Sequence, residues 1–283
     1  MLSTNYKDEY TKILNKQLYY VLNNKYSNFY KDKFRNIWIT NISNYQDFCK
    51  IPFLKKDDIL NTNVKKRTFI DNNKIAKYSI SSWTTKNLIP SIIPHWDYSY
   101  NNNKANIDRD LNISKKTKLL VLLPYSTPIL FAVIYKFKNI IPIIWNIKNL
   151  KISALIAKEL EIDGIITLPT ILNNFIIELK NINFNFNSVN FISLWWEFCS
   201  TLFQNYIKEI FPNTYIQFKY WNSEFGWILW YRCKILWNKE KPNIFHINEY
   251  VLLEIINKET KKPVLLWEYW EITITDLRIW KAF

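Results

Sequence analysis

Leu119-Leu120-Val121-Leu122-Leu123 is the stretch that decides the fold, because it is a short and uninterrupted apolar run of strand length. Ile140–Ile144 and Gly164–Leu168 repeat this pattern further along the chain. Helices are expected between and after these runs, at Ile129–Tyr135, at 152–160 and directly after Pro169. Strands buried on both faces have continuous apolar sequences, and strands that alternate with helices are typical of parallel sheets. The sequence therefore predicts an α/β fold of mainly parallel sheets layered with helices.

Length and composition indicate a globular protein of one or two domains. The chain has 283 residues, of which 48% are hydrophobic, and this fraction excludes a disordered chain. The polar start, Met1–Lys16, has no apolar signal core, and prolines and lysines interrupt 119–144 before it reaches the about 18 apolar residues of a membrane span. Three cysteines, Cys49, Cys199 and Cys233, form no C-x-x-C pair and suit a reducing compartment. We therefore expect a cytoplasmic protein with no membrane partner.

The net charge of +14 raises the question of a nucleic-acid partner. The lysines are scattered among Asn, Ile, Tyr and Phe, residues whose codons are rich in A and T, and they form no long basic run. Charge without a motif is a weak indication of nucleic-acid binding. We expect no specific nucleic-acid partner.

Glycine and tryptophan occur in unusual numbers. Average usage of about 7% glycine would give roughly 20 glycines in a chain of this length. The chain has 2 glycines and 13 tryptophans. Because an α/β protein needs residues that tolerate positive φ in its turns, either Asn and Asp make the turns or tryptophans occupy glycine positions.

One strand and the turn after it carry the most informative motif. Tyr215-Ile216-Gln217-Phe218 is a predicted strand, and Tyr220-Trp221-Asn222-Ser223-Glu224-Phe225-Gly226 is predicted to form a tight turn. The second segment resembles the Tyr-Gly-x-Thr/Ser-Glu motif of the adenylate-forming enzymes, in particular their phenylacetate–CoA ligase-like branch. Trp221 stands where this family has glycine.

Other segments resemble the same family in the same order along the chain. Ser81-Ser82-Trp83-Thr84-Thr85-Lys86 resembles its Ser-Ser-Gly-Thr-Thr-Gly phosphate loop, although a Ser/Thr-rich turn is the plain alternative. Phe191–Glu197 resembles its Gly-Gly-Glu segment, with the alternative that Trp195-Trp196 is a core pair or a sugar-stacking surface. Further similar segments are 18–34, 42–59, Gly164–Thr170 and Pro263–Leu277.

The resemblance implies an enzyme that transfers AMP from ATP to a carboxylic acid and then forms a thioester with coenzyme A. It implies that Glu224 is catalytic and binds Mg²⁺, while Tyr220 packs on adenine. The implied nucleotide-binding residues are Ser81, Ser82, Trp83, Thr84, Thr85, Trp195, Trp196, Glu197, Tyr220, Trp221, Asn222 and Ser223. The expected partner is a small carboxylic acid, with an aryl acid favoured, and a homodimer is one expectation.

The resemblance also implies the domain layout. Residues 1–283 correspond to an incomplete N-terminal adenylate-forming domain, with a helical segment at 1–75 and a nucleotide-binding α/β core at 76–283. Family members continue beyond the position of Thr275-Asp276-Leu277 into an Arg-Tyr-x-Thr-Gly-Asp motif and a small C-terminal domain. We therefore expect the C-terminal small domain to be absent and the chain to be unable to complete the reaction by itself.

Many tryptophans fall on glycine positions of this family. Those that match family glycines are Trp83, Trp195, Trp196, Trp221, Trp267 and Trp270, and those at common family turns are Trp38, Trp145 and Trp280. A large indole cannot occupy a place where backbone must touch a ligand. The hypothesis is that UGA, translated here as Trp, means Gly in the source. A lineage that truly uses UGA for Trp is the alternative.

Three further interpretations remain open. Some relatives bind zinc after the Tyr-Gly-x-Thr-Glu motif, so Cys233 and His246 are a candidate zinc pair, with unrelated buried residues as the alternative. The chain is also compatible with an acyl-protein synthetase or another adenylate-transferring enzyme. A third alternative is a basic module whose Trp and Lys side chains bind nucleic acid or glycans.

Overall fold

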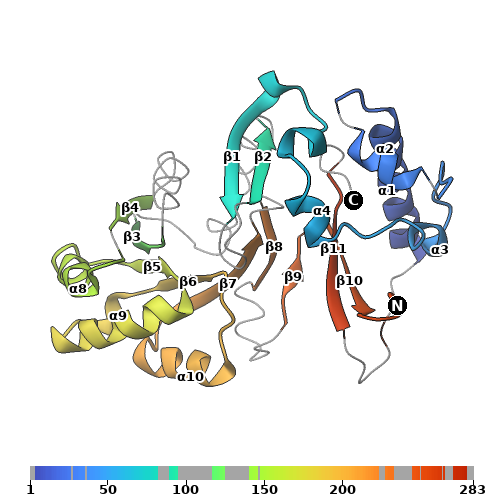
Figure 1. The fold of residues 1–283 in the computed structure, drawn as a ribbon. Coiled ribbons are helices and arrows are strands. Elements are labelled where there is room, and N and C mark those ends of the chain that lie inside the picture. The colour runs from blue at the N-terminus through green and yellow to red at the C-terminus, as the bar shows by residue number, and fades with distance from the viewer. Residues whose placement is uncertain are drawn as a thin grey trace. The chain divides into compact units, whose positions relative to one another are not determined.

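The computed structural model describes residues 4–26, 28–35, 37–81, 89–94, 117–124, 140–145, 147–222, 227–232, 244–248, 250–262, 264 and 270–278. The chain forms two compact units (Figure 1). The first consists of Met1–Tyr100, Ser223–Trp227 and Ile247–Phe283, and the second of Asn101–Asn222 and Ile228–His246. The division of the chain at residue 75, inferred from the sequence, stays a prediction.

A seven-stranded sheet organises the second unit. Its strands are β3 (Thr117–Leu122), β4 (Ile140–Ile144), β5 (Gly164–Thr167), β6 (Phe191–Trp195), β7 (Tyr215–Asn222), β8 (Trp227–Arg232) and β9 (His246–Ile247). The strand order is β4-β3-β5-β6-β7-β8-β9. The pairs β3–β4, β3–β5, β5–β6 and β6–β7 are parallel. The predicted α/β class with a mainly parallel sheet is confirmed.

Helices connect these parallel strands. They are α8 (Leu150–Glu159), α9 (Pro169–Asn181), η3 (Phe186–Ser188) and α10 (Thr201–Ile210). Figure 1 shows α8, α9 and α10 along one side of the sheet, as right-handed crossovers require. The five parallel strands all end at one edge, which we call the carboxyl edge, and start at the opposite one, the amino edge. The order of these five strands is that of doubly wound sheets, which bind ligands outside their carboxyl ends.

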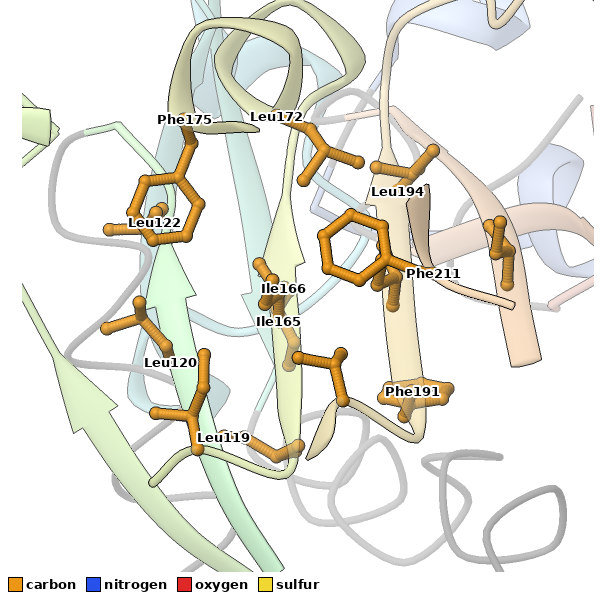
Figure 2. Packing of buried hydrophobic residues seen from close by; sticks show 14 of the residues in the cluster. Leu119, Leu120, Leu122, Ile165, Ile166, Leu172, Phe175, Phe191, Leu194 and Phe211 are labelled. Atoms are coloured by element: carbon orange, nitrogen blue, oxygen red, sulfur yellow. The ribbon is translucent and has the colours of Figure 1, made fainter. Parts of the chain in front are cut away.

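The core of the second unit lies between the sheet and α9. Leu172 and Phe175 of α9 are fully buried and point toward Leu122 and Leu194 of the strands (Figure 2). Gly164 shows how tightly the strands pack, because a Cβ atom there would lie 2.6 Å from Leu119 Cδ2 and 2.9 Å from the backbone oxygen of Phe191.

The first unit is built from both ends of the chain. Its elements are α1 (Thr4–Asn23), α2 (Phe29–Phe34), α3 (Tyr45–Phe48), α4 (Lys56–Leu60), η1 (Val64–Arg67), η2 (Asn72–Lys74), β1 (Ile75–Ser81), β2 (Ile89–Pro94), β10 (Val251–Asn257) and β11 (Trp270–Asp276). β1–β2 and β10–β11 are antiparallel pairs. Leu14, Leu18 and Leu277 share its hydrophobic core, and Gln17 Nε2 of α1 donates hydrogen bonds to the carbonyl oxygens of Asp276 and Arg278. The first helix therefore anchors the last strand.

Two of the element boundaries that differ from the sequence prediction lie near the candidate site. Leu168 is the N-cap of α9 and not the last residue of β5. β7 continues through Trp221 and Asn222, so the predicted turn begins later than the sequence suggested. The predicted helix at Ile129–Tyr135 lies outside the described residues. Among the helices described, none has the length and apolar character to cross a membrane.

Candidate functional site

Two of the predicted nucleotide-binding segments lie next to each other at the carboxyl edge. Trp195, the last residue of β6, is in register with Lys219 of β7. The backbone N–H of Trp196 donates to the carbonyl oxygen of Lys219 at 3.2 Å. The structure therefore brings Trp195–Glu197 and Tyr220–Asn222 together. In the chain the two segments are separated by 22 residues, which include α10.

The turn after β6 has an unusual backbone. Trp196 has φ of 65°, and the N–H of Glu197 donates to the carbonyl oxygen of Trp195 at 2.8 Å. In an L-residue this left-handed conformation brings Cβ close to the following carbonyl oxygen, at a cost of roughly 1–2 kcal/mol. Glycine lacks this penalty, so the position favours glycine.

Glu197 connects this turn to the amino terminus of α9. Its Oε2 accepts a hydrogen bond from the N–H of Thr170 at 2.9 Å, and both carboxylate oxygens accept from Thr170 Oγ1, at 2.9 and 2.8 Å. The N-cap residue Leu168 makes no side-chain capping bond, and Pro169 follows it. Glu197 therefore supplies the cap that α9 lacks. Sequence reasoning missed Thr170 as a site residue, and its position after an N-terminal proline was the available signal.

Polar side chains lie beneath the turn on one face of β6 and β7. Trp195 Nε1 donates to Ser193 Oγ at 2.8 Å, and Ser193 Oγ donates to Gln217 Oε1 at 3.4 Å. Ser193 and Gln217 are fully buried. Lys219 is 4% exposed, and its Nζ lies 5.7 Å from the centroid of the Trp195 ring, within cation–π distance. The alternation of polar residues at 217 and 219 was the signal for this face, and sequence reasoning did not use it.

Tyr220 has one ring face already covered. Its ring stacks on that of Trp230 in β8, with centroids 4.2 Å apart and planes at 7°. A planar base could therefore pack against the opposite face of Tyr220 only. Trp230 was not among the predicted site residues, because no local pattern pairs β7 with β8.

Buried groups behind the turn support it. Arg232 Nη1 donates to Gln204 Oε1 at 2.8 Å, and Gln204 Nε2 donates to the carbonyl oxygen of Cys199 at 2.9 Å. Burial raises the pKa of the Cys199 thiol to about 12, against the opposing effect of Arg232. Cys199 is therefore a protonated thiol at neutral pH, with a packing role.

The structure describes only some of the other predicted site residues. Ser81 is the last residue of β1 in the first unit. His246 lies exposed in β9, with its ring centroid 5.4 Å from that of Tyr231. The predicted site residues outside the described part of the chain are Ser82, Trp83, Thr84, Thr85, Ser223, Glu224 and Cys233. Within the described residues, no three His, Cys, Asp or Glu side chains gather as metal ligands would. The Mg²⁺ and Zn²⁺ sites stay predictions.

No protein-family model matches the sequence, and no curated protein matches it. Solved structures do match the fold. An open conformation of 2-hydroxyisobutyryl-CoA ligase in complex with 2-HIB-AMP and CoA has a TM-score of 0.81 at 11% identity, covering 99% of this chain and 68% of that one. A long-chain-fatty-acid-CoA ligase (FadD1) from Archaeoglobus fulgidus has a TM-score of 0.55 at 12% identity, covering 74% and 43%. The o-succinylbenzoate CoA synthetase (MenE) from Bacillus subtilis has a TM-score of 0.55 at 13% identity, covering 73% and 41%.

The extent of these matches indicates which part of the fold is present. Three other structures of 2-hydroxyisobutyryl-CoA ligase match 99% of this chain and only 61–62% of their own length. The likeness at such low identity concerns the fold alone. The chain has the α/β fold of the N-terminal domain of adenylate-forming acyl-CoA ligases.

Proposed function

We propose that this chain takes part in the ATP-dependent activation of a carboxylic acid to an acyl-AMP, followed by thioester formation with coenzyme A. A carboxylate oxygen attacks the α-phosphorus of ATP and pyrophosphate leaves; the thiol sulfur then attacks the acyl carbon and AMP leaves. One observation carries the proposal. The motif segments Trp195–Glu197 and Tyr220–Asn222 lie side by side at the carboxyl edge of a fold shared with CoA ligases.

The proposed roles follow from position and chemistry. The face of the Tyr220 ring opposite Trp230 would pack on adenine. Trp195, Trp196 and Glu197 would border the base. The phosphate oxygens would accept hydrogen bonds from the hydroxyl groups of Ser81, Ser82, Thr84, Thr85 and Ser223. The same two motif segments contain Trp83, Trp221 and Asn222, which complete the proposed nucleotide site. Glu224 would hold Mg²⁺, which supplies charge neutralisation at the phosphates when bound.

The finer assignments rest on the motif resemblance. The subtype is phenylacetate–CoA ligase-like, the acid is an aryl acid, and the protein acts in the cytoplasm, with a homodimer as its assembly. Binding of acyl-adenylate analogues tests the acid class without requiring turnover. In the chain carrying Trp83→Gly, Trp195→Gly, Trp196→Gly and Trp221→Gly, we expect benzoyl-sulfamoyladenosine to bind more tightly than acetyl-sulfamoyladenosine in calorimetry. Equal affinities would contradict the aryl assignment, and binding of neither analogue would contradict the function.

We also propose that UGA codons translated here as Trp encode Gly in the source. Two backbone conformations support this proposal. Trp38 and Trp196 have φ of 49° and 65°, in the region that glycine favours, and both were predicted glycine positions. Trp38 is also 89% exposed, so no packing explains a large apolar side chain there. Peptide mass spectrometry of the native protein tests the proposal, and peptides with Trp at 221 and 267 would refute it.

A further inference from the structure

We propose that Glu197 is a positioning residue, which holds the turn 195–197 in place through Thr170 and does not contact the nucleotide. This inference rests on the proposed nucleotide site. It concerns how that site obtains its shape, and it changes the role expected for Glu197 from a border of the nucleotide to a support of the turn.

The hydrogen bonds of Glu197 are the first argument. The Thr170 N–H donates to Glu197 Oε2 at 2.9 Å, and the single hydrogen of the Thr170 hydroxyl is shared between Oε1 and Oε2, at 2.9 and 2.8 Å. Hydrogen bonds from a helix N-terminus to an ionised carboxylate are about twice as strong as those between neutral groups. Because both oxygens are engaged there, the carboxylate is turned toward α9 and away from a nucleotide on β7.

The strain in the turn is the second argument. Trp196 holds a positive φ, which unsupported chain would not keep. Two contacts flank this residue. Its own N–H is bonded to the Lys219 carbonyl oxygen on β7, and Glu197 is bonded to Thr170 on α9. The turn is therefore held from both neighbouring elements, so the conformation depends on Glu197.

The electrostatics of α9 are the third argument. A helix N-terminus attracts anions, and at α9 the Glu197 carboxylate already occupies this place. Nucleotide phosphates would be repelled from the N-terminus of α9. We call the bonded pair Glu197 and Thr170 the clamp. The clamp shapes the turn, and its negative charge directs the nucleotide phosphates to other hydrogen-bond donors. None of these bonds uses an indole, so the first and third arguments are unchanged whether residues 195 and 196 are Trp or Gly. The strain argument applies to Trp196 only, because glycine lacks this penalty.

Hydrogen exchange tests the clamp in the chain as it stands. Glu197→Ala should lower the protection of the Thr170 amide roughly tenfold and also that of residues 196–197, because a charge-assisted bond is lost. Thr214→Val is the matched control, because Thr214 Oγ1 bonds the Val189 carbonyl oxygen at the amino edge of the same sheet. It should leave Thr170 unchanged. Unaltered exchange at Thr170 in Glu197→Ala would overturn the proposal, whether or not the chain binds nucleotide.

Nucleotide affinity separates positioning from contact. The parent for this test is the chain carrying Trp83→Gly, Trp195→Gly, Trp196→Gly and Trp221→Gly. If this parent does not bind ATP·Mg²⁺, the result counts against the proposed function and leaves the role of Glu197 to the exchange experiment. In a parent that binds, Glu197→Ala should weaken ATP·Mg²⁺ binding roughly tenfold. Thr170→Val keeps the backbone N–H bond to Glu197 and should weaken binding less, and the double variant should be no weaker than Glu197→Ala. Thr170→Ser, which keeps the hydroxyl, should retain the affinity, as should Thr214→Val. A loss with Glu197→Ala beside no loss at all with Thr170→Val would show direct contact and overturn the proposal. So would unchanged affinity in both.

Discussion

The two edges of the parallel sheet differ in how their loops are held. At the amino edge, backbone groups and short side chains satisfy one another: Asp163 Oδ2 accepts from the Lys118 N–H at 2.8 Å, and the Asp163 carbonyl oxygen accepts from the Asn190 N–H at 2.7 Å. At the carboxyl edge, a strained turn is held by its own charged side chain, Glu197, which is bonded to Thr170 of α9 outside the turn. The amino edge is built for packing, whereas the carboxyl edge maintains a shape that its local sequence disfavours.

Positive φ values show the same difference. Glu161 and Asn183, with φ of 48° and 52°, follow the last turns of α8 and α9, where a left-handed residue commonly ends a helix. Trp196 follows a strand and ends no helix. Strain of this kind clusters at functional sites. The difference therefore locates the candidate site at the carboxyl edge.

The largest expected effect concerns the thiol behind the carboxyl edge. Cys199 is 6% exposed and its pKa is raised to about 12 by burial, with Arg232 opposing, whereas Cys49 is exposed. The pKa of the Cys49 thiol is also raised, chiefly by burial, so the contrast rests on access as well as on the thiolate fraction. Because the thiolate is the nucleophile, iodoacetamide at pH 8 should label Cys199 roughly a hundredfold more slowly than Cys49. Because the pKa of Cys199 is about 12, its small thiolate fraction grows with each pH unit between pH 7 and 10. The labelling rate of Cys199 should therefore rise throughout this range.

This labelling is measured by peptide mass spectrometry in a Cys233→Ser background, with the urea-unfolded chain as the control in which both cysteines react. Glu197→Ala should accelerate labelling of Cys199 and leave Cys49 unchanged. Equal rates at the two cysteines in the native chain would contradict a closed structure behind the turn.

The next effect belongs to the amino edge. Gly164→Ala adds a Cβ that would meet the Phe191 backbone oxygen at 2.9 Å, so the strands must shift. Overpacking of this kind should lower the free energy of unfolding by about 2 kcal/mol in urea titration. Ala157, also fully buried, lies on α8 outside this strand contact, and Ala157→Gly controls for a one-carbon change. A Gly164→Ala chain as stable as its parent would contradict the tight amino edge.

The smallest expected effect separates two neighbouring tryptophans. At Trp196, replacement by glycine should give a chain about 1 kcal/mol more stable than replacement by alanine, because only alanine keeps the strained Cβ. At Trp195, within β6, the sign should reverse, with alanine better by roughly 0.5–1 kcal/mol. Comparing glycine with alanine removes the loss of indole packing from both pairs. If alanine were at least as stabilising as glycine at position 196, the turn would be unstrained.

The parallel sheet could be predicted from sequence because its strands are buried on both faces. Leu119–Leu123 is a continuous apolar run for this reason. Ile140–Ile144 is an equally apolar run in the end strand β4, where Ile141 is exposed, and both runs form strands close to the predicted bounds. The end of β7 could not be predicted, because the strand is extended to Asn222 by pairing with β8, a partner that no local pattern identifies.

The candidate site was accessible to sequence reasoning only where a motif is contiguous. Trp195–Glu197 and Tyr220–Asn222 were identified in this way, and the sheet then places them together. The bonds between Glu197 and Thr170 span 27 residues, and their existence depends on the packing of β5 beside β6. Lys219 and Ser193 were missed because their chemistry follows from the sheet face they share and not from neighbours in sequence.

The most direct test of the account is whether the carboxyl edge binds ATP·Mg²⁺. The measurement is isothermal titration calorimetry on the chain carrying Trp83→Gly, Trp195→Gly, Trp196→Gly and Trp221→Gly, beside the same chain with Glu224→Gln. We expect saturable binding that is weakened by Glu224→Gln, because that change removes the carboxylate proposed to hold Mg²⁺. The chain with all four tryptophans should bind more weakly. Absence of binding in the chain with four glycine replacements, or identical affinity with Glu224→Gln, would contradict the proposed nucleotide site.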